Sequence, residues 1–442
     1  MNPVVITALD QEGRGIARVD GKAIFVEGAL IGERVAIEVY QRKPNYERAR
    51  AVEILNHSAL RVTPRCRYFG TCGGCSLQHI DATAQVAVKQ RVLEDALWHI
   101  GRLRPQQLLA PIHGPSWGYR QRARLSVRDV PKKGGVLIGF RERKSTYVTD
   151  MSSCEVLPPN ISALLPALRA LIGRLSIHDR IPQIELARGE SADGPVDVLV
   201  LRILAALSPA DELELAAFGD LHRVHLWTQT GGPATVLPLH PRDSHLGYAL
   251  PDFGVHFDFD PTEFTQVNSD VNRVLVRRAI GLLDPAPGER IADFFCGLGN
   301  FTLPIARHGA SVIGIEGSAS LVRRATANSA ANGLAALAQF TTANLFEATV
   351  ESLAALGPFD KALIDPPREG AIELVKALPA GGLSRIVYVS CNPATLARDA
   401  SVLVNEQRYT LRAAGIANMF PHTAHVESIA LFERDAMPAI AG

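Results

Sequence analysis

The sequence predicts an α/β domain in the carboxyl-terminal part of the chain, preceded by a small β-barrel and a mixed α+β region. Three observations support this prediction. Short strand-like runs separated by glycines occupy residues 1–57, strand and helix patterns mix over 58–250, and strands alternate regularly with helices from about residue 251 onward. A chain of 442 residues is long for one hydrophobic core. We therefore expect three domains, at 1–57, 58–250 and 251–442.

The composition is that of an ordinary soluble globular protein, with 47% hydrophobic and 21% charged residues and a formal net charge of +1. The charge is unevenly distributed. Residues 1–150 carry 24 Lys and Arg against 14 Asp and Glu, whereas residues 151–442 carry 22 against 31. The basic part is therefore the candidate for binding a polyanion. No basic, apolar leader and no run of 18 apolar residues is evident, so we expect a cytoplasmic protein.

The first 57 residues alternate apolar and polar positions with a period near two, as in VVITALD, GKAIFVEGAL and ERVAIEVYQ. Glycines separate these runs, which is typical of a small barrel. The segment resembles a TRAM domain, an RNA-binding barrel of the OB type. Its basic and aromatic side chains would form an RNA-binding rim, namely Arg42, Lys43, Tyr46, Arg48 and Arg50.

Two features are expected in the region that follows. Residues 82–103 repeat apolar positions at helical spacing and predict an amphipathic helix, which we expect to pack on a neighbouring domain, with the last domain as a candidate. Residues 117–148 alternate strongly and turn at Lys133-Gly134-Gly135, which predicts a hairpin. Nine Lys and Arg against two acidic residues lie between positions 120 and 144. We expect Arg120, Arg122 and Arg124 to share one strand face and to contact RNA.

Four cysteines have a spacing that predicts a metal site. Three lie in CRYFGTCGGCSLQH and the fourth in MSSCEVLP, so that Cys66, Cys72, Cys75 and Cys154 can supply four thiolates. The Gly73-Gly74 pair lets the backbone curl around such a site. Zinc and iron–sulfur both accept four thiolates, and the spacing alone does not separate them.

The stretch DFFCGLGNFTLPIA, residues 293–306, places a strand, a glycine turn and a helix start in that order. Gly297 and Gly299 allow close approach of a ligand, but Thr302 stands where a dinucleotide-binding turn has its third glycine. A nucleoside without phosphates, such as S-adenosylmethionine, fits better. The next strands end at Glu316, Asn344 and Asp365, and these polar groups are expected at one edge of the sheet.

A fifth strand, RIVYVSC, ends in Cys391 and is broken at once by Asn-Pro. A thiol at this position faces the same crevice and would need a helix N-terminus or a cation to become a thiolate. Glu427 in FPHTAHVES is a candidate base, and Gln266 lies at the entrance to the domain. A methyl donor, a thiolate and a base together fit methylation at carbon 5 of uracil, because thiolate addition to carbon 6 makes carbon 5 nucleophilic.

The motifs SCNPATLARD, FPHTAHVES and DFFCGLGNFTLP, together with the cysteine spacing, resemble the bacterial RNA uracil-5-methyltransferases from end to end. The barrel and the cysteines make the chain more similar to the 23S ribosomal RNA type than to the transfer-RNA type. The resemblance implies a Rossmann-like methyltransferase domain and a four-iron four-sulfur (4Fe-4S) cluster held by the four cysteines. It also implies Cys391 as nucleophile, Glu427 as base, and S-adenosyl-L-methionine bound by Gln266, Phe295, Asn300, Glu316, Asn344 and Asp365.

Several alternatives remain at this point. A transfer-RNA uracil-5-methyltransferase would use the same chemistry. RNA cytosine-5 enzymes resemble one another in a cysteine near Asp-Pro-Pro, which KALIDPPREG lacks. Amine methyltransferases usually carry an aromatic residue after Asp-Pro-Pro, where Arg368 stands. A ribosome-assembly protein that binds RNA through an inert methyltransferase domain is the alternative from another class. We expect a monomer with no obligate protein partner.

Overall fold

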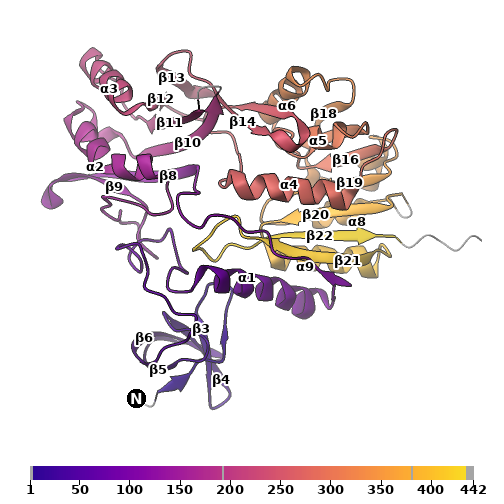
Figure 1. Cartoon of the computed structure of the whole chain (residues 1–442), viewed down its shortest axis with the longest axis horizontal. Coiled ribbons are helices and arrows are strands. Elements are labelled where there is room, and N and C mark those ends of the chain that lie inside the picture. Colours follow the sequence, from indigo (N-terminus) through magenta and orange to yellow (C-terminus); the bar gives the residue numbers. More distant parts are fainter. Residues whose placement is uncertain (1–2, 192–193, 380–381, 435–442) are drawn as a thin grey trace, which may run out of the picture.

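The computed structural model describes residues 3–191, 194–379 and 382–434, which form three sheets with their own apolar cores (Figure 1). The amino-terminal sheet lies at one end of the molecule, and the other two lie beside each other above it (Figure 1). Within the described ranges, no helix is both long and apolar enough to cross a membrane.

The amino-terminal sheet has six strands in the order β1-β5-β6-β4-β3-β2, as the alternating pattern predicts. Alternate residues such as Ile6, Val26 and Val35 are buried in one core because successive side chains point to opposite faces. Lys144 of the second domain donates to Glu27 of β4 and ties the two parts together. The strands are β1 (Val4–Val5), β2 (Ala8–Leu9), β3 (Gly15–Val19), β4 (Lys22–Glu27), β5 (Arg34–Arg42) and β6 (Tyr46–Asn56).

The predicted helix over 82–103 is present as α1 (Ala82–Ala96), which continues into a π-helical turn, η1 (Leu97–Gly101). Asp81 caps its start by accepting from the backbone N–H groups of Thr83 and Ala84. The helix packs on the last domain, against α9 and β21. A Cβ at Gly101 would come within 2.7 Å of the Ala397 carbonyl oxygen, so glycine permits this close contact. The short strand β7 (Gln107–Leu108) then joins β21 in parallel.

The second sheet contains the predicted basic hairpin and is covered on one face by two helices, α2 (Pro159–Arg174) and α3 (Pro209–His222). The predicted boundary at residue 251 would separate β15 from this sheet. However, β15 pairs antiparallel with β14 along its whole length and therefore belongs to the second sheet. We therefore propose that the boundary of the last domain falls near residue 260. The strands are β8 (Arg122–Val130), β9 (Gly135–Gly139), β10 (Gln183–Ser191), β11 (Gly194–Arg202), β12 (His225–Gln229), β13 (Val236–His240), β14 (Leu246–Leu250) and β15 (Val255–Phe259).

The third sheet is the predicted doubly wound α/β sheet, with strand order β18-β17-β16-β19-β20-β22-β21-β7. The first five strands of this order are parallel, and β22 runs antiparallel to both neighbours. Helices α4 and α5 cover one face, and α1, α8 and α9 cover the other. The strands are β16 (Arg290–Phe294), β17 (Ser311–Glu316), β18 (Ala338–Thr342), β19 (Lys361–Ile364), β20 (Arg385–Ser390), β21 (Thr410–Ala417) and β22 (Glu427–Glu433).

The remaining helices connect these strands. The α-helices are α4 (Ser269–Leu283), α5 (Thr302–Ala306), α6 (Ala319–Ala331), α7 (Val350–Ala354), α8 (Ile372–Ala377) and α9 (Pro393–Asn405). The short 3₁₀ turns are η2 (Pro131–Lys133), η3 (His178–Arg180), η4 (Pro233–Thr235), η5 (Pro251–Phe253) and η6 (Leu345–Glu347).

Candidate active site and thiol cluster

The five parallel strands of the third sheet end at one common edge, and the polar residues predicted from the sequence lie there. Glu316 is the last residue of β17, and Asp365 and Cys391 directly follow β19 and β20. Asn344 follows β18 after one further residue. Because parallel strands place their carboxyl ends together, ligands of open α/β sheets bind at this edge.

The glycine turn after β16 has the backbone that its sequence predicts. Gly297 and Gly299 adopt φ angles of 57° and 96°, in the left-handed region that favours glycine. Phe295 also has a positive φ, 63°, and its N–H donates to the Ile315 carbonyl oxygen at 2.9 Å. The Glu316 carboxylate accepts from the Gly297 N–H at 3.2 Å, so the turn and the end of β17 are fixed relative to each other.

Asn300 is held between the second and third domains. Its Oδ1 accepts from the Tyr248 hydroxyl at 3.0 Å and from Asn272 Nδ2 at 3.1 Å, and its Nδ2 donates to Asn272 Oδ1 at 3.1 Å. Tyr248 belongs to β14 and Asn272 to α4. One Nδ2 hydrogen of Asn300 remains for a ligand, so this residue both positions the turn and can bind.

Two further predicted residues flank the turn. Asn344 is exposed, and its side chain accepts from the Phe346 N–H at 3.1 Å, which places the ring of Phe346 5.6 Å from that of Phe295. Gln266 is half-buried in the segment that leads into α4.

Cys391 lies in a tight connection between β20 and α9. The Ser390 hydroxyl accepts from the Asn392 N–H at 3.1 Å, and Asn392 caps α9 by accepting from the Ala394 N–H at 3.1 Å. The helix begins at Pro393, as the sequence after the cysteine predicts. The thiol is therefore next to the positive end of a helix, which favours its ionised form.

In the free protein, burial has a larger effect on the pKa of Cys391 than the helix does. Burial, followed by repulsion from Glu427 and Asp365, raises the pKa of Cys391 to about 11, and Arg368 opposes the rise. The pKa of Glu427, which is only 4% exposed, is raised to about 8 by burial and then by Asp365. Burial also raises the pKa of Asp365 to about 7. The site thus collects three acidic groups whose pKa values are all raised, mainly by burial.

Arg368 is the positively charged residue that interacts with Cys391 and Glu427. Residues at the start of α9 hold its backbone in place. The Arg368 carbonyl oxygen accepts from Asn392 Nδ2 at 3.0 Å and from the Thr395 hydroxyl at 3.3 Å. Its guanidinium donates to His425 Nδ1 at 2.9 Å. Burial and the charge of Arg368 lower the pKa of His425 to about 4, so the imidazole is neutral and can accept this bond. The sequence signal for this arginine is its place directly after Asp-Pro-Pro.

The loop between β21 and β22, which leads to Glu427, is anchored by residues from the first half of the chain. Lys89 of α1 is 1% exposed, and its Nζ donates to Asn418 Oδ1 at 2.7 Å and to the Phe420 carbonyl oxygen at 2.8 Å. Burial lowers its pKa to about 7. Gln85, also of α1, accepts from the His422 N–H at 2.8 Å. Sequence reasoning assigned α1 only a packing role, although a lysine within its apolar stripe was a signal.

Two buried aspartates near the site also escaped sequence reasoning. Asp293 on β16 is fully buried, accepts from the Thr302 hydroxyl at 2.5 Å, and has a pKa raised by burial to about 7. Asp399 on α9 accepts from the Tyr388 hydroxyl at 2.6 Å and from the Ala371 N–H at 2.7 Å. Asp399 therefore ties the loop that carries Arg368 to the helix that follows Cys391.

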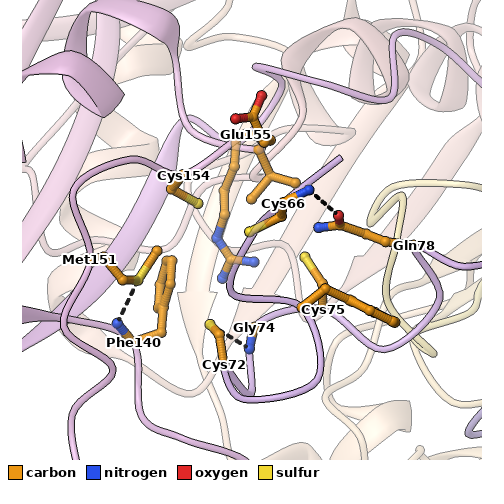
Figure 2. Close-up of a pocket in the computed structure, with 12 residues that line it drawn as sticks. Cys66, Cys72, Gly74, Cys75, Gln78, Phe140, Met151, Cys154 and Glu155 are labelled. Carbon is orange, nitrogen blue, oxygen red and sulfur yellow. Dashed lines mark hydrogen bonds between the residues drawn. The ribbon is translucent and has the colours of Figure 1, made fainter. Parts of the chain in front are cut away.

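The four predicted thiols, Cys66, Cys72, Cys75 and Cys154, line one small cavity (Figure 2). Burial and mutual repulsion raise the pKa of Cys75 to about 12 and that of Cys154 to about 11. Gly73 supplies the sharp turn, since a Cβ there would lie 3.0 Å from the Arg141 carbonyl oxygen. Among the residues described, no three potential ligands are close enough to hold a single metal ion.

The basic hairpin is present, and the guanidinium of Arg122 within it is engaged by the protein itself. Its guanidinium donates to the Pro261 carbonyl oxygen at 2.6 Å and also contacts the Glu263 carbonyl oxygen and the Thr265 hydroxyl. Arg122 therefore fixes the segment leading to Gln266. Arg124 pairs with Glu185 at 3.0 Å but remains 68% exposed. The alternating sequence pattern predicted that these arginines share one strand face. The pattern could not show that a neighbouring loop covers part of that face.

Two family descriptions match parts of the chain. The tRNA (Uracil-5-)-methyltransferase family matches residues 249–435, and the TRAM domain matches residues 2–52. The second match confirms the barrel predicted at the amino terminus.

Whole-length relatives give a closer comparison. The 23S rRNA (uracil(1939)-C(5))-methyltransferase RlmD of Aromatoleum aromaticum is 64% identical over 437 residues, which cover 98% of this chain and 100% of the relative. The protein of the same name from Azoarcus sp. is 62% identical over 436 residues, with 98% and 100% coverage. Among solved structures, the Pyrococcus abyssi tRNA (uracil-54, C5)-methyltransferase in complex with S-adenosyl-L-homocysteine superposes with a TM-score of 0.73 at 24% identity, covering 97% of this chain and 99% of that one. This likeness confirms the fold.

Proposed function

Because the chain belongs to the RlmD family of 23S rRNA (uracil-C(5))-methyltransferases, we propose that it methylates carbon 5 of a uridine in 23S ribosomal RNA. The observation that carries this proposal is the identity of 64% over 98% of the chain, combined with a thiol and a carboxylate at the ligand edge of the sheet. As a ribosomal RNA enzyme, it would act in the cytoplasm, and its chemistry needs no second protein chain.

The methyl donor would be S-adenosyl-L-methionine, bound along the carboxyl edge. The Glu316 carboxylate, held by the turn, suits the ribose hydroxyls, and the rings of Phe295 and Phe346 suit the flat adenine. Asn344 is exposed at the same edge. Asn300 retains one free amide hydrogen, and Gln266 and Asp365 would complete the binding set.

The chemistry follows from the uracil ring, whose carbon 5 is a poor nucleophile. The Cys391 thiolate forms a bond to carbon 6, and the electron pair of the ring double bond moves to give an enolate at carbons 4 and 5. Carbon 5 would then take the methyl group of S-adenosyl-L-methionine, whose bond from sulfur to that methyl group would break to release S-adenosyl-L-homocysteine. Glu427 removes the proton from carbon 5, the bond between sulfur and carbon 6 breaks, and the thiolate is regenerated.

Charge explains how a thiol with a raised pKa becomes reactive. Arg368 favours the anionic forms of Cys391 and Glu427, although burial dominates in the free protein. When bound at this edge, the methyl donor would supply a second positive charge on its sulfonium, which would favour the thiolate and both carboxylates. We therefore propose that the nucleophile is activated only when the donor is bound, which avoids unproductive addition to RNA.

The target uridine must leave its base stack to reach Cys391, which costs a few kcal/mol and less in a looped or single-stranded RNA. Phe264 is 69% exposed in the segment before Gln266 and offers a ring on which a base can stack. Arg124 is exposed on the strand that leads away from this segment and would bind the RNA backbone.

We also propose that Cys66, Cys72, Cys75 and Cys154 hold a 4Fe-4S cluster. Two buried and two half-buried thiols line one cavity, and four thiolates in such a place can hold a cluster of this kind. The cluster would join the loop at 66–78 to Cys154. The N–H groups of Ser76 and Leu77 in that loop donate to the His422 carbonyl oxygen at 2.9 and 3.0 Å, so this join would support the loop that leads to Glu427.

The test is a covalent trap. Fluorine at carbon 5 cannot be removed as a proton, so 23S RNA containing 5-fluorouridine should remain bound after methyl transfer. Purified protein with this RNA and S-adenosyl-L-methionine should give an adduct on a denaturing gel, and Cys391→Ala should give none. Radiolabelled methyl entering unmodified 23S RNA without any adduct would overturn the uracil-5 mechanism in favour of amine methylation. If transfer RNA gave the adduct and 23S RNA did not, the substrate assignment would be wrong.

A further inference from the structure

A basic hollow lies on the second sheet and plays no part in the reaction described above. It has a volume of about 180 Å³, room for roughly six waters at the volume each occupies in the liquid. Its polar lining consists of three guanidinium groups and three neutral hydrogen-bonding side chains: Ser126, Arg128, Arg141, Thr146, Gln183 and Arg202.

The sheet register builds this hollow. Gln183 of β10 stands between Ser126 of β8 on one side and Arg202 of β11 on the other. Arg128 projects from the same face of β8 as Ser126, because alternate strand residues share a face. The loop after β9 forms the remaining wall of the hollow. Within this loop, the backbones of Arg141 and Val148 form an isolated antiparallel β-bridge. The three guanidinium groups therefore come from two strands, β8 and β11, and one loop, and Gln183 of the strand between them lies among them.

The charge of the hollow is not balanced by the protein. Among the described residues, neither Arg128 nor Arg141 forms an ion pair. The carboxylate on the same face, Glu185, accepts from Gln183 Nε2 at 2.7 Å and pairs with Arg124 at 3.0 Å. Arg202 uses one N–H on the Gly231 carbonyl oxygen at 3.1 Å and keeps the others. Convergent guanidinium groups without a carboxylate suit a bound oxyanion.

We propose that this hollow binds a backbone phosphate of the RNA substrate, at a distance from the target uridine; the proposal rests on the function proposed above. Arg122 of β8 contacts the segment that leads to Gln266, and Arg128 lies six residues further along the same strand. Six residues of extended strand span ~20 Å, so the bound phosphate belongs to a flanking nucleotide. The site has no aromatic side chain for a base and fixes the RNA chain without reading its sequence.

The test compares the salt dependence of RNA binding between two sets of variants. The site variant replaces Arg128, Arg141 and Arg202 with Gln. The matched control is Arg408→Gln, an exposed arginine between α9 and β21, which lies at the sheet edge opposite Cys391. For a single-stranded region, each lost phosphate contact lowers the slope of log affinity against log salt by about 0.7. On a long 23S fragment, we expect the salt-dependence slope of the site variant to be smaller than that of wild type by at least about 0.7. The slope of Arg408→Gln should be unchanged.

The length of the RNA separates this site from contacts near the target. With an oligonucleotide restricted to the target uridine and its nearest neighbours, which cannot span ~20 Å, the site variant and wild type should have equal slopes. Thermal melting of each variant checks that it is folded, and Arg128→Gln alone, at an exposed position, should still lower the slope.

Each other outcome overturns the proposal. A slope equal to that of Arg408→Gln on the long RNA would show that no phosphate is bound there. If inorganic phosphate stabilised wild type but not the site variant while the RNA slopes agreed, the hollow would be a site for a free anion. Methyl transfer by wild type is measured separately, so failure of the proposed function would be recognised independently.

Discussion

Cys391 follows the last residue of β20, and Glu427 is the first residue of β22. The antiparallel register pairs Ser390 with Ser428, so one further step of the same register would place Cys391 opposite Glu427, and repulsion from Glu427 contributes to the raised pKa of the thiol. Directly opposed residues of antiparallel strands have Cβ atoms about 4.5–5.5 Å apart. The sheet therefore brings the proposed nucleophile and base together, and a one-residue slip of β22 would turn Glu427 to the other face.

Replacing Glu427 with Gln should stall the reaction after methyl transfer. Without a base the proton at carbon 5 stays, so unmodified 23S RNA should accumulate as a covalent, methylated adduct on a denaturing gel. Turnover should fall roughly 10²- to 10⁴-fold. Glu373→Gln on the exposed face of α8 removes the same charge and should turn over normally. If Glu427→Gln turned over as fast as this control, another group would be the base.

The buried carboxyls should make the protein less stable as the pH rises. Glu427, Asp365 and Asp293 have pKa values raised to about 8, 7 and 7 from 4.5, 3.8 and 3.8. Such groups bind protons more tightly in the folded chain, so their contribution is fully present below the unfolded pKa and is lost as pH rises through the folded pKa. Lys89, whose pKa is lowered to about 7, acts in the opposite direction, so the carboxyl contribution is measured as the fall in urea midpoint from pH 5 to pH 8.5 in wild type relative to variants that lack one carboxyl. Asp365→Asn and Glu427→Gln should reduce this fall, and an unchanged fall in both would contradict the assignment.

Arg368 should control the reactivity of Cys391. Its charge lowers the pKa of the thiol, so Arg368→Gln should raise that pKa and slow alkylation of the cysteine by iodoacetamide roughly tenfold at pH 8. Mass spectrometry of the peptide containing Cys391 reports the rate without interference from the other cysteines. Arg368→Lys, which keeps the charge, should recover part of the rate. Equal rates in all three proteins would show that Arg368 does not act on the thiol.

Metal analysis should distinguish a 4Fe-4S cluster from a single zinc ion, since four cysteines can hold either. Anaerobically purified protein should contain about four iron and four sulfide per chain. Cys75→Ser should lose them and should also increase hydrogen exchange at residues 418–426, because the loop at 66–78 holds the His422 carbonyl oxygen. One zinc per chain, with no sulfide, would contradict the iron–sulfur proposal.

The sequence predicted most of the fold and the positions of the site residues for a physical reason. Strands and their terminal residues follow from local periodicity, and parallel strands necessarily end together, so Glu316, Asp365 and Cys391 could be placed at one edge. Lys89 could not be assigned its role, because its partner Asn418 is 329 residues away and only tertiary packing brings them together. The intramolecular partners of Arg122 could not be predicted for the same reason, since the loop that contacts its guanidinium comes from another part of the chain.

The distance between Lys89 and Asn418 also has a consequence during protein synthesis. Helix α1 leaves the ribosome early, whereas the loop and strands on which it packs are made 329 residues later. At 5–20 residues per second this interval is about 16 to 66 s, during which the apolar face of α1 has no native partner. The catalytic centre can form only when translation of the chain is nearly finished, so a truncated product would leave this helix face exposed and would be a natural substrate for chaperones and proteases.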